Sequence, residues 1–535
     1  IEQPQFYKQL EDSDFSLVRK EISLICKDEN IEPGTYTGKD VTEIIRKLQN
    51  RLYKKITDLI SIYSPESIHY YAIDKLSYNQ FLKFENDRRW NYPFDFPDEL
   101  KIDHLDIVMS KNDEYITTIQ DLKNLIELNL TIPRFEELIN INVSNFNIIE
   151  AFIHWIGVLQ SASDLEYYEM GFIELEITYD YIINTNSTEI FDLSNLQMKD
   201  KIYNYNTYQI KLDDLDKKYL EKVKDALKRD LGFRLEDLYD VVQFLSVNFK
   251  NNNYKQISKN IYEINKNDLI EMIFKDCDEQ FPKQDIIRTI DYLILDIKKL
   301  KQVDGDVSDL LPIWEREKRN NRFDQKPLLI VDDKVQFSPV NCGILNREWG
   351  LGLFDFMLPY TIGLENTDKV ISEWKSRYEK QIVEDIANIF IELNLSDARL
   401  FKEQYLHKLD KKGNHPKELG DYDILFIDNV NKVVWNVEAK FIKKHKSIKE
   451  FYRRQYNFFK KSEYDIKFNN RIEYIENNFN KLKSAFGITN QDKYDFKNMF
   501  VLNKHFIPVF QNVKGLEYCS IGEFRIKVID YYKKS

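Results

Sequence analysis

At 535 residues the chain is too long for a single hydrophobic core, and about 150 residues per domain suggests roughly three units. Apolar residues make up 43% and aromatic residues 14%, which excludes a largely disordered chain. Cys26, Cys277, Cys342 and Cys519 show no paired spacing, so we expect neither a disulfide framework nor a thiolate zinc site. No apolar run is long enough to cross a bilayer, and we expect a soluble, cytoplasmic protein.

The net charge of −12 is unevenly distributed along the chain. Residues 371–535 contain 31 Lys and Arg against 23 Asp and Glu, whereas the remaining residues contain 46 against 66. A basic C-terminal part on an acidic body is typical of a module that meets a polyanion such as nucleic acid. The same asymmetry would also let the two parts of the chain attract each other.

Helical periodicity dominates the beginning of the chain. Residues 41–63 place apolar side chains at helical spacing, and residues 1–200 as a whole are predicted to be a mainly helical region of unknown function. An Asn-rich passage over residues 184–207 is predicted to be a linker or insertion. His154 lies on an apolar stretch, so we expect a hydrogen-bonded core residue rather than a metal ligand.

Residues 201–320 are predicted to form a helical middle region. It contains a clear amphipathic pattern that Gly232 breaks into a helical hairpin. Residues 321–368 follow as a connector, in which a β-hairpin is expected to turn at Asp332 and Asp333.

The last predicted unit covers residues 369–535. Its patterns predict a helix, a strand, a hairpin turning at residues 429–432, two further helices, another strand and a final strand-helix tail. This αβββαβ-like order favours an α/β domain with a mixed sheet flanked by helices. The expected fold class is therefore multidomain, with a mainly α N-terminal region and a C-terminal α/β domain.

The hairpin GDYDILFIDNVNKVVWNVEAKF, residues 420–441, concentrates charged side chains at one end. With the predicted turn, Asp423 faces Glu438 and Asp421 faces Lys440 across an antiparallel ladder. Side chains alternate with period two along a strand, so all four share one face of the hairpin. A solvated polar side of a surface hairpin is the competing interpretation.

Carboxylates that face each other directly destabilise a sheet unless a positive group lies between them. A divalent cation such as Mg²⁺ or Mn²⁺ would serve, and a neighbouring lysine can orient or deprotonate water and offset charge on a scissile phosphate. The opposite face of the hairpin is apolar and suited to packing on a helix. It is expected to carry Tyr422, Ile424, Phe426, Trp435, Val437 and Ala439.

The motif GDYD…NVEAK, preceded by a helix with RYEKQIVEDI, resembles the PD-(D/E)xK superfamily of restriction-endonuclease-like nucleases. The resemblance covers residues 369–535, less than a third of the chain. It implies an αβββαβ core, phosphodiester hydrolysis and Mg²⁺ or Mn²⁺ as cofactor. The catalytic residues that it implies are Asp423, Glu438, Lys440 and Glu379, with Asp423, Glu438, Glu379 and the backbone carbonyl of Ala439 as metal ligands.

Several positions remain open within this resemblance. Asp421 stands where many relatives have glutamate, and would be a secondary ligand or a partner for Lys440. Gln455 falls near the place of an active-site glutamine in some relatives. Glu384 is the rival of Glu379, although either residue could be an ordinary solvated helical glutamate.

A basic, aromatic-rich segment follows the hairpin. Phosphate contacts from lysine and arginine would supply salt-dependent affinity, while aromatic rings could stack on unpaired bases. Phe451 and Phe458 are expected to be core residues instead, and a merely solvated basic face is the alternative for the charges. The residues predicted to bind nucleic acid are Lys443, Lys444, Lys446, Arg453 and Arg454.

Together these patterns predict a divalent-metal-dependent nuclease. The resemblance favours DNA over RNA and a bacterial restriction or antiphage-defence setting. The acidic N-terminal region would regulate or target the enzyme, or bind a protein partner or effector, and homo-oligomers are compatible with this picture, whereas a membrane partner is not expected. The alternatives are a ribonuclease, or a non-catalytic nucleic-acid or protein interaction module with a surviving nuclease fold.

Overall fold

The chain divides into two compact units, each described here by itself. The N-terminal unit comprises Ile1–Glu189 with Tyr219–Ile371, and the C-terminal unit comprises Ile190–Lys218 with Ser372–Ser535. The computed structural model describes residues 9–89, 98–168, 173–180, 182–187, 214–247, 254–277, 282–303, 306–311, 313, 319–354, 356–411, 413–443, 448–506 and 508–534.

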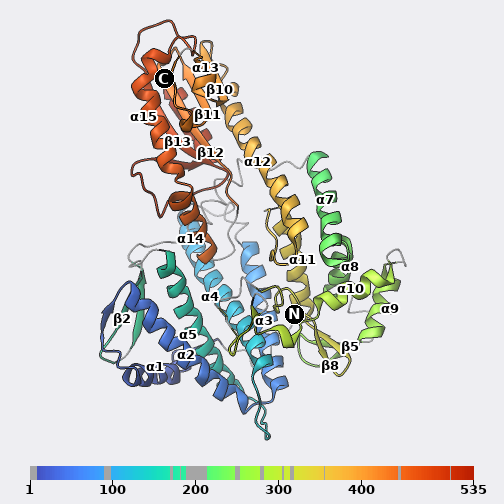
Figure 1. Ribbon diagram of the computed structural model, residues 1–535. Helices are drawn as coiled ribbons and strands as arrows, with labels where there is room; N and C mark the ends of the chain where they lie inside the picture. Colours follow the sequence, from blue (N-terminus) through green and yellow to red (C-terminus); the bar gives the residue numbers. More distant parts are fainter. Residues whose placement is uncertain are drawn as a thin grey trace. The chain divides into compact units, whose positions relative to one another are not determined.

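Helices make up most of the first segment of the N-terminal unit (Figure 1). The helix predicted over residues 41–63 is present, and its buried apolar residues recur at helical spacing. None of the described helices combines the length and apolar composition that crossing a bilayer requires. The elements are α1 (Ser16–Asp28), β1 (Gly34–Tyr36), α2 (Lys39–Ser61), α3 (Pro65–Arg89), α4 (Asp98–Thr131), α5 (Val143–Tyr168), β2 (Ile173–Ile177) and β3 (Ile183–Ser187).

The predicted linker over residues 184–207 begins with a strand instead. β3 pairs antiparallel with β2, and Ile183 is buried opposite Ile177. The Asn-rich composition hid this strand because its cross-strand partners lie on the preceding strand rather than in the local pattern. Residues 188–207 lie outside the described part of the chain.

The second segment of the N-terminal unit begins within the first of two helices that Gly232 separates, as predicted. α7 (Asp214–Leu231) and α8 (Leu235–Ser246) are separated by Gly232, whose φ of +83° favours glycine. The elements that follow are β4 (Lys255–Gln256), β5 (Tyr262–Asn265), α9 (Lys266–Asp276), α10 (Lys283–Leu293), η3 (Ile297–Lys299), β6 (Gln302–Val303), β7 (Asp306–Val307), β8 (Leu329–Val331), β9 (Lys334–Phe337), α11 (Pro339–Phe354) and α12 (Glu365–Glu392).

Asp332 and Asp333 form the turn between β8 and β9, as the sequence predicts. Their φ angles are +46° and +63°, the pair of left-handed conformations that a two-residue hairpin turn requires. Aspartate tolerates this region better than most residues because its short side chain can hydrogen-bond locally. Val331 and Lys334 pair directly across the turn.

A buried polar cluster joins three helices of the N-terminal unit. Lys75 Nζ on α3 lies 2.6 Å from Glu150 Oε2 on α5, and His154 Nδ1 lies 2.9 Å from Asp121 Oδ2 on α4. Burial opposes the charge of His154, but the hydrogen bond to Asp121 and the nearby carboxylates outweigh it and raise the pKa of His154. His154 is hydrogen-bonded to Asp121, as expected, with a side chain that is 29% exposed.

The C-terminal unit is built on one mixed sheet of five strands in the order β10-β11-β12-β13-β14. Strands β10 to β12 run antiparallel, whereas β13 and β14 extend the sheet in parallel. The expected α/β architecture with a mixed sheet is therefore confirmed. After α12 come β10 (Ala398–Gln404), α13 (Leu406–Leu409), η5 (Lys417–Leu419), β11 (Tyr422–Asp428), β12 (Val433–Lys440), α14 (Ile448–Tyr456), the π-helix η6 (Asn457–Lys461), α15 (Tyr464–Leu482), β13 (Asp495–Leu502), β14 (Glu517–Ser520) and α16 (Ile521–Lys534).

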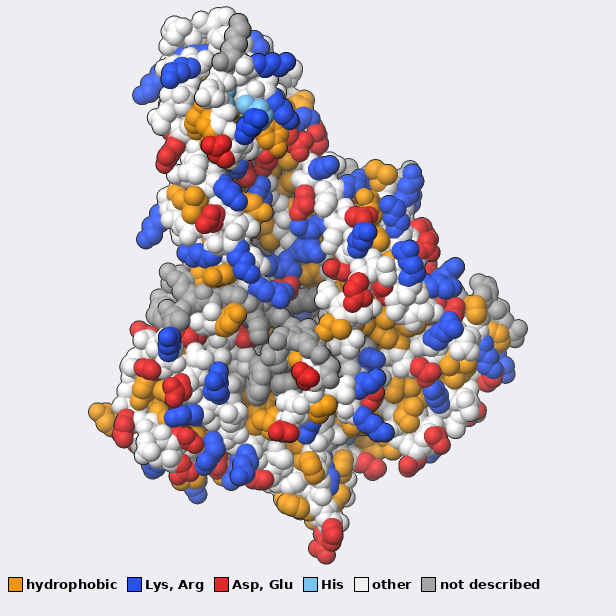
Figure 2. All heavy atoms as spheres, viewed as in Figure 1, with side chains coloured by type: hydrophobic (Ala, Val, Ile, Leu, Met, Phe, Trp, Pro, Cys, Tyr) orange, Lys and Arg blue, Asp and Glu red, His pale blue; other side chains and the backbone are white. Residues whose placement is uncertain are grey.

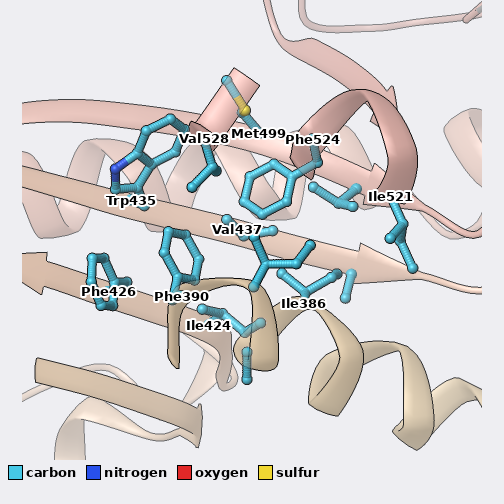
Figure 3. Close-up of a cluster of buried hydrophobic side chains, with 14 of the residues drawn as sticks. Ile386, Phe390, Ile424, Phe426, Trp435, Val437, Met499, Ile521, Phe524 and Val528 are labelled. Atoms are coloured by element: carbon cyan, nitrogen blue, oxygen red, sulfur yellow. The ribbon is translucent and has the colours of Figure 1, made fainter. Parts of the chain in front are cut away.

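One face of this sheet packs against α12 and α16 (Figure 3). Phe390 of α12 stacks on Phe426 with ring centroids 4.2 Å apart, and its ring centroid lies 6.0 Å from that of Trp435. Phe524 of α16 meets Phe390 edge to face. The apolar alternation predicted for the hairpin is confirmed for the residues that belong to this cluster, Ile424, Phe426, Trp435, Val437 and Ala439.

The opposite face of the sheet is also covered. Residues of β11 and β12 on that face pack against α15 in a second cluster, which includes Leu425, Ile427 and Val434. Tyr422 belongs to this second cluster, so its predicted placement with Ile424 was wrong. Alternation was extrapolated one pair too far, because the regular ladder between β11 and β12 begins at Ile424.

A segment distant in sequence contributes to the C-terminal unit. Asp216 on α7 is buried and accepts hydrogen bonds from two side chains of α12, Trp374 Nε1 at 2.8 Å and Arg377 Nη1 at 2.5 Å. A buried carboxylate needs such partners because an unpaired charge is costly away from water. The first residues of α7, up to Lys218, are therefore part of this unit.

Phe390→Ala is expected to destabilise the C-terminal unit by about 3–5 kcal/mol, because it removes a ring that three other aromatic rings surround. Hydrogen exchange of peptides from β11 and β12, measured by mass spectrometry on the full chain, checks this expectation. Ile391→Ala is the matched control, since the neighbouring side chain is 59% exposed. Equal acceleration of exchange in the two variants would contradict the packing described.

Candidate active site

The hairpin of β11 and β12 adopts the register and the turn that the sequence predicts. Ile424 pairs with Val437 and Asp428 with Val433, which leaves residues 429–432 as the turn. Asp428 stabilises that turn, because its Oδ1 accepts a hydrogen bond from the backbone N–H of Val430 at 2.8 Å. The opposite end of the hairpin therefore brings Asp423 beside Glu438, as expected.

Lys440 connects the two carboxylates. Its Nζ lies 2.7 Å from Glu438 Oε1 and 3.4 Å from Asp423 Oδ2. Asp423 Oδ2 also accepts from the backbone N–H of Ala439 at 2.8 Å, which fixes its side chain against β12. The ring of Tyr464 lies under the ammonium group, 5.3 Å from Nζ to the ring centroid. Three of the four predicted catalytic residues thus converge.

Arg471, which the sequence did not single out, is the fourth member of this cluster. Its Nη2 donates a hydrogen bond to Glu438 Oε2, so the two oxygens of Glu438 have different cationic partners. The Glu438 side chain is only 4% exposed and that of Arg471 only 9%. Two carboxylates and two cations therefore form one buried, charge-balanced group, which we call the ionic cluster: Asp423, Glu438, Lys440 and Arg471.

The ionic cluster changes the protonation of Asp423. Burial and the neighbouring charge of Glu438 raise the pKa of Asp423 to about 6, although Lys440, Arg471 and the Ala439 N–H favour its ionised form. Burial opposes the charge of Lys440, but Glu438 and Asp423 raise the pKa of Lys440 to about 12. Lys440 is therefore a firm cation in this arrangement rather than a proton acceptor.

The predicted helical acid does not join the ionic cluster. Glu379 forms an ion pair with Lys375, one helical turn earlier, and its side chain is 43% exposed. Its rival Glu384 pairs with Lys402 of β10, with Lys402 Nζ 2.6 Å from its Oε2. Neither glutamate meets Asp423, because the orientation of α12 is set by the apolar stripe that it buries against the sheet.

The two possible secondary site residues, Asp421 and Gln455, also lie in other surroundings than predicted. Lys440 contacts Asp423 and Glu438 rather than Asp421, which precedes β11 and lies outside its regular ladder. Gln455 of α14 is buried, and its Oε1 accepts from the backbone N–H of Val509 at 3.3 Å. Asp421 and Gln455 therefore add no described contact to the ionic cluster.

The predicted nucleic-acid-binding segment is only partly described, since Lys444 and Lys446 lie outside the described residues. Arg453 and Arg454 both pair with Glu450 on α14, which offsets part of their charge. The face of the molecule in Figure 2 mixes both signs of charge. Aromatic residues of the segment are largely buried, as expected for Phe451 and Phe458, and Tyr452 and Phe459 are buried with them.

The donor chemistry of the ionic cluster suits a hard cation. Mg²⁺ commonly takes one or two carboxylates, completing its shell with water and substrate phosphate. Asp423 and Glu438 supply two such groups within reach of one ammonium nitrogen. In the described ranges no group of three or more His, Cys, Asp and Glu side chains is placed to hold a metal. Asp423 and Glu438 are therefore the two carboxylates that could hold such a cation.

A weak sequence signal for Arg471 exists only in retrospect. It is one of three cations in an Asn-rich helix, without a motif around it, and its partner Glu438 lies 33 positions earlier. Two buried carboxylates need more than one cation to balance their charge. This requirement indicates a second basic residue but does not identify it.

Asp423→Asn is expected to stabilise the C-terminal unit at pH 7 in EDTA. Because folding raises the pKa of Asp423 above its ordinary value, its contribution is present below about pH 4 and is lost as the pH rises through about 6. The shift corresponds to a penalty on the order of 3 kcal/mol at pH 7. Hydrogen exchange of β12 peptides between pH 4 and 7, corrected for intrinsic rates, should show a flatter stability profile in the variant.

The control for this measurement is Asp421→Asn, the same change two residues earlier and outside the ionic cluster. It should leave the pH profile of β12 unaltered. A loss of stability at pH 7 in Asp423→Asn would contradict the raised pKa.

The candidate site thus consists of two carboxylates, a lysine that touches both, and an arginine that fixes one of them. Its chemistry has to be inferred from these residues and their geometry. Comparisons with models of protein families, with curated proteins and with solved structures found no match for the chain.

Proposed function

We propose that the C-terminal unit hydrolyses phosphodiester bonds in nucleic acid with the help of a divalent cation. The observation that carries this proposal is the convergence of Asp423, Glu438 and Lys440 at one end of a hairpin whose apolar face is buried. Such a grouping of two acids and an amine beside a place for a cation is suited to phosphate chemistry. The αβββαβ order of the unit supports the resemblance to PD-(D/E)xK nucleases.

Asp423 and Glu438 are the residues that would hold Mg²⁺ or Mn²⁺, with the backbone carbonyl of Ala439 as a further oxygen donor. A bound cation of this kind activates water and neutralises charge on a phosphate. Asp423 binds it best when ionised, so binding should strengthen as the pH rises through about 6. Glu438 would contribute Oε1, since Arg471 occupies Oε2.

Lys440 would act through its charge. Its raised pKa keeps the ammonium group protonated at neutral pH, so it donates hydrogen bonds and does not abstract a proton. When substrate binds, Lys440 can exchange its contact with Glu438 for a non-bridging phosphate oxygen. A donor placed where negative charge grows in the transition state is typically worth 100-fold or more in rate.

DNA is the favoured substrate because of the resemblance, and RNA is the alternative. Lys443, Arg453 and Arg454 remain candidates for backbone contacts beside the site. The acidic N-terminal unit would then select the target or respond to a partner, as proposed for a restriction or antiphage-defence protein.

A second candidate function is a non-catalytic binding module. The specific observation that favours it is the pairing of both carboxylates, Asp423 with Lys440 and Glu438 with Lys440 and Arg471, which leaves the ionic cluster neutral as it stands. Glu379 adds no third acid to the site. In such a module, the cluster would stabilise the fold only.

Incubation of the full chain with supercoiled plasmid, linear duplex DNA and RNA, in Mg²⁺, Mn²⁺ or EDTA, tests the proposal. We expect cleavage with a divalent cation and none in EDTA, with a loss of at least about 100-fold in Lys440→Ala. Asp423→Asn should lose cleavage while gaining stability, which separates a catalytic role from a structural one.

Lys432→Ala is the matched control, because Lys432 lies at the turn end of the same hairpin and pairs with Asp492. It should cleave as the unsubstituted protein does. Nucleic-acid binding without metal-dependent cleavage on any substrate would favour the binding module, and cleavage of RNA alone would redirect the proposal to a ribonuclease.

A further inference from the structure

Arg471 is anchored more firmly than the lysine with which it shares Glu438. Its Nη2 donates to Glu438 Oε2, and its Nη1 donates to the backbone carbonyl of Leu419 at 3.2 Å. Its own backbone carbonyl accepts the hydroxyl of Tyr422 at 3.0 Å. Both ends of the residue are therefore tied to the segment that enters β11, and the side chain is 9% exposed.

The segment that enters β11 is shaped to meet Arg471. Gly420, directly after η5, has a φ of +75°, a conformation that favours glycine. The carbonyl of the preceding residue, Leu419, accepts a hydrogen bond from the guanidinium group. Helix α15, the entry to β11 and Glu438 on β12 are thereby joined through one side chain.

Lys440, in contrast, has only the two carboxylates and the ring of Tyr464 as described partners. Its side chain is 24% exposed, against 9% for that of Arg471. Of the two cations on Glu438, Lys440 is thus the one that can leave without breaking a further hydrogen bond to the backbone.

We propose that Arg471 is a positioning residue that serves as the permanent partner of Glu438 and so frees Lys440 for the substrate phosphate. This inference rests on the proposed function. Arg471 assigns the two oxygens of Glu438, Oε2 to itself and Oε1 to the reaction centre, and it keeps Glu438 charge-paired when Lys440 turns away. No bond is made or broken in this step, since only hydrogen-bond partners are exchanged.

Without Arg471, Glu438 would be a buried carboxylate with Lys440 as its single cation. Lys440 would then be confined to Glu438, and the orientation of Glu438 would no longer be fixed. Residues that orient a metal ligand through its other oxygen or nitrogen typically alter metal affinity 10- to 100-fold when removed. A divalent cation should therefore bind much more weakly, even though no ligand has been changed.

Arg471→Met in the full chain tests the inference, with Mn²⁺ titrated and free Mn²⁺ followed by electron paramagnetic resonance in the absence of nucleic acid. The half-saturating Mn²⁺ concentration is expected to rise at least about 10-fold. Arg471→Lys should recover part of the loss, because it keeps the charge without the two-pronged contact. The Mg²⁺ concentration that half-saturates cleavage should rise in the same order.

Lys483→Met is the matched control, because Lys483 is a buried cation at the end of the same helix and donates to the carbonyl of Asp492 at 2.6 Å. It removes an equal charge at the residue that follows α15 and should leave Mn²⁺ binding within twofold of the unsubstituted protein. Tyr422→Phe is the second variant, to be used if Arg471→Met does not fold. It removes the hydroxyl that donates to the backbone carbonyl of Arg471, and should weaken Mn²⁺ binding about 2- to 5-fold.

Mn²⁺ binding by Arg471→Met that is unchanged or tighter would overturn the inference and leave the proposed function standing. For an unfolded Arg471→Met, unchanged binding by Tyr422→Phe would do the same. Absence of Mn²⁺ binding by the unsubstituted protein, with no cleavage in Mg²⁺ or Mn²⁺, would overturn the proposed function and this inference with it.

Discussion

The register between β11 and β12 is the constraint on which the rest of the C-terminal unit depends. Because side chains alternate along a strand, a slip by one residue would turn Trp435 and Val437 out of their core and Glu438 into it. The apolar contacts of Phe390, Phe426 and Trp435 make that slip costly. Packing on one side of the sheet therefore determines where charge is presented on the other.

The ionic cluster is expensive to build and easy to disturb. Burying a carboxylate away from water is unfavourable, and removing a cation that compensates it commonly costs about 3–5 kcal/mol. The chain meets this cost with two cations for two acids and with backbone donors such as the N–H of Ala439. Asp423 is the least favourably placed member of the cluster. Burial and the charge of Glu438 raise its pKa to about 6, so a further positive charge nearby would stabilise its ionised form.

Much of this unit could be predicted from sequence because its determinants are local. The turn at residues 429–432, the pairing of Ile424 with Val437 and the approach of Asp423 to Glu438 all follow from alternation and a short loop. Tyr422 was misplaced because the alternation was carried beyond the paired residues.

The rest depended on how elements pack, which periodicity does not contain. Glu379 and Glu384 differ from the prediction because the rotation of α12 about its axis decides which acid approaches the sheet. Arg471 could not be found, since its contact joins a helix and a strand without any short motif. In the N-terminal unit, β3 was missed for a related reason, because only its partner strand identifies it.

The contact of Asp216 with Trp374 and Arg377 limits where the chain can be truncated. Residues on both sides of the 219–371 segment belong to the same compact unit. A truncation that starts at residue 369 would retain the β11–β12 hairpin but discard the carboxylate that anchors the first turns of its supporting helix. The C-terminal unit is therefore made of two separate stretches of the chain, and a fragment meant to contain it has to include residues 214–218 as well.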